Sequence, residues 1–195
     1  MNFKFSGLYG CIVIAFLLLQ SLTSCAQPAE KNNGLKWYTN LDEAQILSNT
    51  SKKPIFGFFT GSDWCGWCKK LQAEVFAKPE FVAWAKKNVI LLELDYPRAK
   101  EQSPEIKQQN ASLQQTFQVR GYPTCWLFYV KDNAETKQKS IEAMGSGGYP
   151  QGATPGKEEV KFLEDMNKIM ADYRAKNPQA AAPAAPKKIS KKKKN

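Results

Sequence analysis

Cys65 and Cys68 stand two residues apart, and two thiols at this spacing can form and reopen a disulfide bond. A purely structural disulfide is a weak explanation, because a bridge over so short a loop restricts the unfolded chain little. A zinc site is also disfavoured, since it needs about four ligands, the chain has no histidine, and Cys125 is the only other cysteine after residue 25. The pair therefore favours redox exchange, and binding of a soft metal ion by the two thiols is the open alternative.

The elements around this dithiol place its first cysteine at the start of a helix. Residues 54–60 are an apolar, aromatic run that predicts a buried strand, and residues 61–63 turn the chain. Apolar residues then recur at helical spacing as Cys68, Leu71, Val75 and Phe76. The pattern predicts a helix that begins near Cys65 and turns Cys68 toward the core.

This placement assigns different roles to the two thiols. The unpaired N–H groups and the dipole of a first helical turn favour an anion, so Cys65 is expected to be the nucleophilic thiolate. Cys68 lies about one turn inside the helix, where burial disfavours its ionised form and shields it from large partners. We expect Cys65 to attack a disulfide in a partner and Cys68 to resolve the mixed disulfide that results.

Residues 64–70, Trp-Cys-Gly-Trp-Cys-Lys-Lys, follow a strand and a tight turn, and they resemble the active site of the thioredoxin superfamily, particularly its envelope-located branches. A second match, Gly-Tyr-Pro-Thr at residues 121–124 before the apolar run 125–130, is similar to the cis-proline loop and following strand of that family. The resemblance covers about residues 35–175. It implies an α/β thioredoxin-like fold, with a central mixed β-sheet flanked by helices on both faces, and a thiol-disulfide oxidoreductase that needs no cofactor.

The resemblance also implies where a substrate binds. In that family the proline faces the dithiol, and the backbone beside it pairs with an extended substrate segment by strand addition. This implies a cis peptide bond before Pro123 and a substrate-binding role for Tyr122 and Pro123, with an ordinary trans turn as the alternative. Trp64 and Trp67 flank the dithiol and are interpreted as substrate-binding parts of an apolar rim, although packing alone would also explain aromatic residues there.

The sequence departs from the family pattern in two respects. The buried acid that many members use to accept the proton of the resolving thiol is aligned with Gly57, and its lysine partner with Leu91. Their joint absence points to another proton acceptor, for which water, Asp63 and Glu93 are candidates. Trp67 offers no cation to the thiolate, unlike the histidine of some relatives, so we favour a reductase.

The first 24 residues have the features of a bacterial lipoprotein signal peptide. An apolar segment at residues 8–22 follows Lys4, and it is too short for a comfortable membrane span of about 20 residues. The sequence Leu-Thr-Ser-Cys, ending at Cys25, resembles a lipobox and predicts lipidation of Cys25; ordinary cleavage after Ala26 is the alternative. Residues 25–34 then form a polar tether that keeps the domain near its membrane.

Residues 35–176 are expected to form one thioredoxin-like domain, and residues 177–195 a disordered tail rich in alanine, proline and lysine. The formal net charge is +10, but without Lys4 and the six tail lysines, 21 basic residues face 18 acidic ones. The domain is therefore not strongly basic, and nucleic-acid binding is not expected outside the cytoplasm. The tail is interpreted as a solvated segment, with contacts to anionic lipid, surface polymer or acidic partners as the alternative.

Further elements follow from periodicity and capping signals. Strands are expected at residues 35–38, 89–95 and 139–144, and helices from Asn40, with Glu43 as its capping partner, from Pro79 and from Ser103. The buried face of a closing helix is expected to carry Val160, Leu163, Met166, Met170 and Tyr173. Residues 145–148 are interpreted as a turn, and Cys125 as a buried, inert thiol. Residues 96–115 exceed the connection in the smallest relatives and either hold partner specificity or form a plain surface helix.

The sequence thus predicts a membrane-anchored thiol-disulfide oxidoreductase of the bacterial cell envelope that faces the periplasm, or a secreted protein if Cys25 is not lipidated. Its expected partners are exported proteins with cysteines or disulfides, an unknown electron-donor protein, and the membrane through the lipid anchor. The rival hypothesis is a non-catalytic binding protein on the same fold, which holds a soft ion such as Cu(I) or client proteins.

Overall fold

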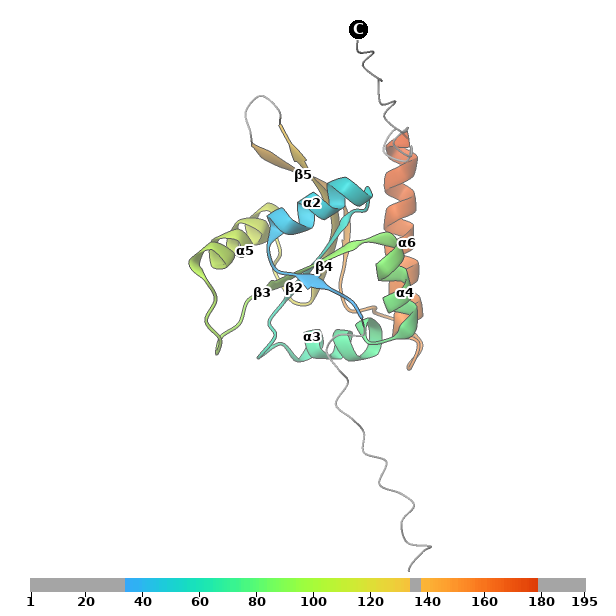
Figure 1. Cartoon of the computed structure of the whole chain (residues 1–195). Coiled ribbons are helices and arrows are strands. Elements are labelled where there is room, and N and C mark those ends of the chain that lie inside the picture. The colour runs from blue at the N-terminus through green and yellow to red at the C-terminus, as the bar shows by residue number, and fades with distance from the viewer. Residues whose placement is uncertain (1–33, 134–137, 179–195) are drawn as a thin grey trace, which may run out of the picture. The chain divides into compact units, whose positions relative to one another are not determined.

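The computed structural model describes residues 34–133 and 138–178, which fold around a five-stranded sheet (Figure 1). The strands are β1 (Trp37–Tyr38), β2 (Ile55–Thr60), β3 (Ile90–Asp95), β4 (Thr124–Asp132) and β5 (Lys139–Gly147). They lie in the order β1-β3-β2-β4-β5, where β1 and β2 run parallel to β3, and β4 runs antiparallel to both β2 and β5. The sheet is therefore mixed, as predicted, and β2 is its central strand.

Helices cover both faces of this sheet. They are α2 (Leu41–Ser51), α3 (Gly66–Leu71), its π-helical continuation η1 (Gln72–Phe76), α4 (Pro79–Asn88), α5 (Pro104–Thr116) and α6 (Glu158–Lys176). Helices α2 and α5 pack on one face, and α3, α4 and α6 on the other (Figure 1). The predicted thioredoxin-like α/β architecture is confirmed.

The helix starts follow the capping signals in the sequence. The side chain of Asn40 accepts hydrogen bonds from the backbone N–H groups of Asp42 and Glu43, at 2.8 and 3.1 Å. The Ser103 hydroxyl caps α5, whose first residue is Pro104. Both starts depend on neighbouring residues alone, which is why the sequence predicted them.

Strand β2 is buried along its whole length and divides the core into two clusters. Phe56 and Phe58 face α3, α4 and α6, in the same cluster as Cys65. Ile55 and Phe59 face α2 and α5. Because side chains alternate along a strand, each β2 position reaches only one of the two clusters, and the dithiol belongs to the first.

The prediction of a turn at residues 145–148 is wrong, because Gly145 and Gly147 lie within β5. A Cβ atom built at Gly145 would lie 2.8 Å from the side chain of Ile169, and one at Gly147 would lie 2.8 Å from that of Met166. The two glycines therefore let α6 pack directly on β5, and they do not end the strand.

The prediction for the buried face of α6 is wrong at Val160, which is 43% exposed. Phe162, which the sequence reading omitted, is buried there instead. The other predicted residues contact the core and are Leu163, Met166, Met170 and Tyr173. Since α6 begins at Glu158, its first turn points Val160 to solvent and Phe162 inward.

Some predictions lie outside the described residues: the signal peptide at residues 1–24, Cys25, the tether up to residue 33, and the tail from residue 179. Within the described ranges, no helix is long and apolar enough to cross a membrane.

Candidate active site

Cys65 and Cys68 form a disulfide bond at the start of α3, with their Cα atoms 5.3 Å apart. Cys65 is the N-cap residue in an extended conformation, and its Sγ accepts a hydrogen bond from the backbone N–H of Cys68 at 3.2 Å. The predicted helix start is therefore confirmed. When the pair is reduced, this N–H and the helix dipole both favour a negative charge on the Cys65 sulfur.

Both cysteines are buried, but not to the same extent. Cys68 is completely buried among the aromatic side chains of the first core cluster, whereas Cys65 keeps 5% of its surface exposed. Of the two, Cys65 at the start of α3 is the residue that a partner's sulfur can reach first. Burial also disfavours the ionised form of a thiol. Cys68 is therefore suited to attack the mixed disulfide within the protein, after Cys65 has reacted with the substrate.

The turn before the dithiol is closed by Gly61, whose carbonyl oxygen accepts a hydrogen bond from the N–H of Cys65 at 2.8 Å. A Cβ atom at Gly61 would overlap the indole ring of Trp64, so only glycine lets this ring fold back over the turn. Ser62 ties the turn to the end of β3 through hydrogen bonds from its N–H and hydroxyl to the carboxylate of Asp95, at 2.7 and 2.6 Å.

Asp63 connects the same turn to the loop that follows β3. Its carboxylate accepts hydrogen bonds from the backbone N–H groups of Ala99, at 2.6 Å, and Arg98, at 3.0 Å. These bonds, that of Ala99 foremost, hold the pKa of the Asp63 carboxyl below its ordinary value. Asp63 therefore holds the two segments together through hydrogen bonds. Because its carboxylate is a weak base, it is a poor candidate for the proton acceptor of Cys68.

The alignment of the family's buried acid with Gly57 is wrong. A Cβ atom at Gly57 would point at Phe128 and Leu94, which belong to the core cluster on the opposite side of the sheet from the dithiol. Phe58 is the neighbouring β2 position on the dithiol side, and it pairs in register with Glu93 of β3. By the alternation of β3, Glu93 shares the dithiol face of the sheet, so it is the remaining carboxylate among the sequence candidates.

The proline loop, the second match to the family in the sequence, lies against the turn of the dithiol. The Tyr122–Pro123 peptide bond is cis, which confirms the prediction. The Tyr122 ring packs against Trp64 with the two ring planes at 89° and their centroids 5.6 Å apart. A Cβ atom at Gly148 would lie 3.1 Å from the carbonyl oxygen of Pro123, so the segment after β5 also packs on this loop.

Trp64 is half-buried and connects the dithiol turn to the loop that follows β3. Its indole N–H donates a hydrogen bond to the carbonyl oxygen of Tyr96 at 2.8 Å, and the guanidinium of Arg98 lies 4.1 Å from the centre of its ring. The packing interpretation of Trp64 therefore has direct support, while its ring still lies between the dithiol turn and Tyr122.

Trp67 differs from Trp64, because it is 55% exposed and projects from the first turn of α3. Its ring meets that of Tyr149 at a centroid distance of 5.0 Å, and the Nζ atom of Lys70 lies 5.1 and 5.0 Å from the centres of the two rings. The Tyr149 hydroxyl donates a hydrogen bond to the carboxylate of Glu74. An exposed aromatic surface thus lies next to Cys65.

Tyr149 is the site residue that the sequence reading missed. Nothing in its local pattern links it to α3, since the contact exists only after β5 has paired with β4. The pKa of the Tyr149 phenol is raised by desolvation and by its hydrogen bond to Glu74, and the hydrogen bond to Tyr149 raises the pKa of Lys70. The phenol therefore remains neutral and keeps its proton for Glu74.

Cys125 lies in β4 and is completely buried, and burial raises the pKa of its thiol. The predicted buried, unreactive thiol is confirmed as to its position. The described residues contain no group of three or more histidine, cysteine, aspartate or glutamate side chains that could hold a metal ion.

The chain matches a family model described as a thioredoxin-like domain over residues 41–138, a range that includes both cysteines and Pro123. It is 34% identical over 154 residues to the disulfide bond reductase DsbH of Chlamydia pneumoniae, which covers 72% of this chain and 89% of that protein. It is 29% identical over 165 residues to the thioredoxin-related protein DsbJ of the same organism, and the match covers 84% of this chain but 46% of DsbJ.

Two solved structures agree with these matches. A DsbH oxidoreductase superposes with a TM-score of 0.58 and 28% identity, covering 70% of this chain and 85% of the other. A thioredoxin from Thermus thermophilus superposes with a TM-score of 0.50 at 14% identity, covering 77% of this chain and 98% of the other, and supports the fold alone.

Proposed function

Because this chain belongs to the thioredoxin superfamily and is a thiol-disulfide oxidoreductase, we propose that it reduces or isomerises disulfide bonds in exported proteins of the bacterial cell envelope. The observation that carries the proposal is the asymmetry of the dithiol: Cys65 caps α3 and keeps some exposure, while Cys68 lies fully buried behind it. A pair used only for stability would not need one thiol at a helix N-terminus and the other fully buried.

The reaction proceeds in two exchanges. The Cys65 thiolate attacks one sulfur of the substrate disulfide, whose S–S bond breaks as the Cys65 mixed disulfide forms, and the released substrate thiolate takes up a proton. Cys68 then loses its proton, attacks the Cys65 sulfur and expels the second substrate thiol. Two electrons pass from the dithiol to the substrate, and the protein is left with its Cys65–Cys68 disulfide.

The substrate-binding surface in this proposal comprises Trp64, Trp67, Tyr122 and Pro123. The backbone at Tyr122 pairs with an extended substrate segment, and the exposed Trp67 ring supplies apolar contact on the other side of Cys65. Support comes from the contact of Trp64 with Tyr122 and from the exposure of Trp67.

Reduction is the favoured direction. Trp67 offers no positive charge that would favour the free thiolate over the disulfide, and the relative DsbH carries the name of a reductase. A second dithiol protein, the unknown electron donor, then restores the reduced state by the same two exchanges in reverse.

Membrane attachment through acylated Cys25 is the part of the proposal that depends on sequence alone. Cleavage before Cys25 would leave residues 25–34 as the tether and would place the domain on the periplasmic side of the membrane, whereas without acylation the protein would be secreted. Labelling cells with a radioactive or clickable fatty acid tests this step. Wild-type protein should take up the label, and a Cys25→Ala variant should not.

The central test is capture of substrates by a Cys68→Ser variant. This variant should accumulate mixed disulfides through Cys65, and the wild type should reduce insulin disulfides with an added dithiol donor. Cys125→Ala is the matched control and should neither trap partners nor lose activity, because the Cys125 thiol is buried away from solvent. If the reduced protein binds Cu(I) tightly but reduces no disulfide and traps no partner, the metal-binding rival is the better description.

A further inference from the structure

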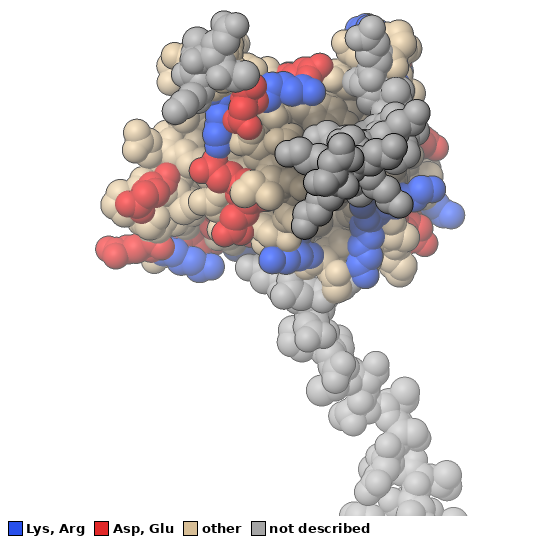
Figure 2. Space-filling view, turned by 45° about the horizontal axis from the view of Figure 1, so that its top comes forward, with Lys and Arg blue, Asp and Glu red and all other residues tan. Residues whose placement is uncertain are grey.

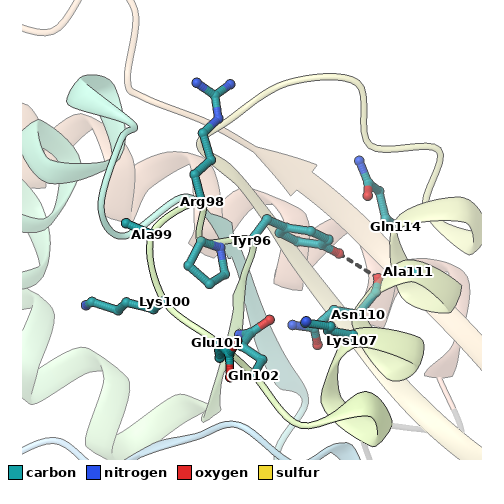
Figure 3. A pocket seen from close by; sticks show the side chains of 11 residues that line it. Tyr96, Arg98, Ala99, Lys100, Glu101, Gln102, Lys107, Asn110, Ala111 and Gln114 are labelled. Atoms are coloured by element: carbon teal, nitrogen blue, oxygen red, sulfur yellow. Dashed lines mark hydrogen bonds between the residues drawn. The ribbon is translucent and has the colours of Figure 1, made fainter.

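A pocket of 630 Å³ lies beside the dithiol turn, between the loop that follows β3 and the helix α5 (Figure 3). The side chains that matter for its chemistry are Tyr96, Arg98, Lys100, Glu101, Lys107 and Asn110. The pocket belongs to the segment of residues 96–115 for which the sequence left a plain surface helix and partner specificity as alternatives. It takes no part in the exchange chemistry described above.

The floor of this pocket is held in place by internal hydrogen bonds. The Tyr96 ring reaches from the loop toward α5, and its hydroxyl donates to the backbone carbonyl of Asn110 at 2.5 Å (Figure 3). The amide nitrogens of Asn110 and Gln102 donate to the carbonyl oxygen of Asp95, at 2.9 and 3.2 Å. A ligand would therefore meet a surface that is already formed, and would not have to order it.

The charges around the pocket are mostly positive. Arg98, Lys100 and Lys107 line it, against the single carboxylate of Glu101. Among the described residues, neither Arg98 nor Lys100 has a carboxylate within ion-pair distance, and Figure 3 shows Lys100 extending from the loop away from α5. Acidic and basic side chains are interspersed over the face of the molecule shown in Figure 2. The rim of the pocket thus offers cations to an incoming anion.

Two residues that line the pocket also contact the dithiol site. Arg98 stacks on Trp64, the residue before Cys65, and its N–H donates to Asp63 in the same turn. The ring of Tyr96 contacts that of Tyr122 at a centroid distance of 5.3 Å. An extended chain that pairs with the backbone at Tyr122 would therefore pass the pocket on the Arg98 side.

We propose that this pocket binds a carboxylate-bearing segment of the protein substrate, a few residues from the cysteine that reacts with Cys65. Arg98 and Lys100, which extend outward at the rim of the pocket, are the binding cations. Arg98, whose guanidinium carbon lies 4.1 Å from the centre of the Trp64 ring, presents its guanidinium N–H groups to the carboxylate. The inference rests on the proposed function and adds the substrate class: proteins whose reactive cysteine lies in an acidic sequence.

Binding is tested apart from chemistry with the oxidised full-length protein and dye-labelled extended peptides that carry serine in place of the reactive cysteine. One peptide has glutamates on the side of the serine expected to reach the pocket, and its partner has glutamines. The glutamate peptide should bind about tenfold more tightly at low salt, and the difference should shrink as salt rises. Equal dissociation constants for the two peptides would overturn the proposal.

Lys100→Gln is the informative variant, because within the described ranges the Lys100 side chain makes no hydrogen bond or ion pair and acts on the fold through its charge near Asp63. It should remove most of the preference for the glutamate peptide. Lys87→Gln removes the same charge from the exposed end of α4 and should leave the preference intact. An equal loss in both variants would mean that net charge alone attracts the peptide, and this also contradicts a specific pocket.

A parallel insulin-reduction assay separates this inference from the proposed function. Disulfide reduction without any preference for acidic peptides would refute the proposed pocket and support the proposed disulfide reductase. A preference for acidic peptides in a protein that reduces no disulfide would support the proposed pocket and refute the proposed reductase.

Discussion

The ring of Tyr149 lies 5.0 Å from the indole of Trp67, with the two planes at 62°, and this contact joins the segment after β5 to the residue between the two cysteines. This contact restricts the conformations of the Trp67 side chain, which is otherwise exposed. A rigid aromatic surface next to Cys65 binds a protein partner with less loss of side-chain freedom than a mobile one.

Tyr149→Ala should therefore weaken the binding of large substrates. We expect KM for a folded protein disulfide to rise about fivefold with kcat unchanged, as for the loss of a contact residue at an interface. Tyr149→Phe keeps the ring and should change KM less than about twofold, although it removes the hydrogen bond to Glu74. A small disulfide such as hydroxyethyl disulfide is the control substrate, and a comparable loss of activity toward it would contradict a role in binding.

The two active-site thiols should differ in reactivity. In the reduced protein at neutral pH, iodoacetamide should modify Cys65 at least about tenfold faster than Cys68, because Cys68 is fully buried and the α3 N-terminus favours the Cys65 anion. Quenched time points and peptide mapping measure both rates in one sample. Equal rates, or a Cys65 no faster than an ordinary exposed thiol, would contradict the division of roles.

Gly61→Ala should destabilise the fold by about 1–3 kcal/mol, since the new methyl group overlaps the Trp64 indole and forces this side chain to move. Gly66→Ala is the matched control in α3. A Cβ atom at Gly66 meets nothing within 4 Å, so this substitution should leave stability unchanged or raise it by about 0.4–1 kcal/mol. Urea unfolding of both variants provides the comparison, and equal free energies of unfolding would refute the steric account of this turn.

Asp63 should contribute stability that depends on pH. The hydrogen bonds from Ala99 and Arg98 lower the pKa of Asp63 in the folded state below the ordinary aspartate value of about 3.9. Its contribution is therefore present above that pH and is lost as the pH falls through the lower folded value. The free energy of unfolding of wild type should exceed that of Asp63→Asn near pH 6, and the difference should shrink as the pH falls below the ordinary carboxyl pKa. A difference that stays constant from pH 6 to pH 2 would show that the carboxylate charge plays no part.

Glu93 is the sequence candidate that lies on the dithiol face of the sheet, in register with Phe58, and we expect it to accept the proton of Cys68 through water or directly. Glu93→Gln should lengthen the lifetime of the Cys65 mixed disulfide about tenfold or more. In this variant the rate at which Cys68 resolves the mixed disulfide should rise with pH, because solvent hydroxide replaces the base. Rapid-quench trapping measures this lifetime. Asp63→Asn should leave this lifetime unchanged. A longer lifetime in Asp63→Asn and an unchanged one in Glu93→Gln would identify Asp63 as the proton acceptor.

The amino-acid sequence determined the features that depend on neighbouring residues. The spacing of Cys68, Leu71 and Val75 predicted the helix that carries the dithiol, because residues three and four apart share one helical face. The caps at Asn40 and Ser103 predicted two further helix starts for the same local reason. The cis bond before Pro123 came from resemblance to a family, and the structure confirmed it.

Only the tertiary structure decided which distant residues share a face or a surface. A shift of one residue in a strand exchanges its two faces, and the alignment at Gly57 therefore pointed to the wrong core cluster. The contacts of Tyr149 with Trp67 and of Arg98 with Trp64 join segments that meet only after the strands have paired. No local periodicity encodes such contacts, because they arise from the packing of elements whose relative positions depend on the whole sheet.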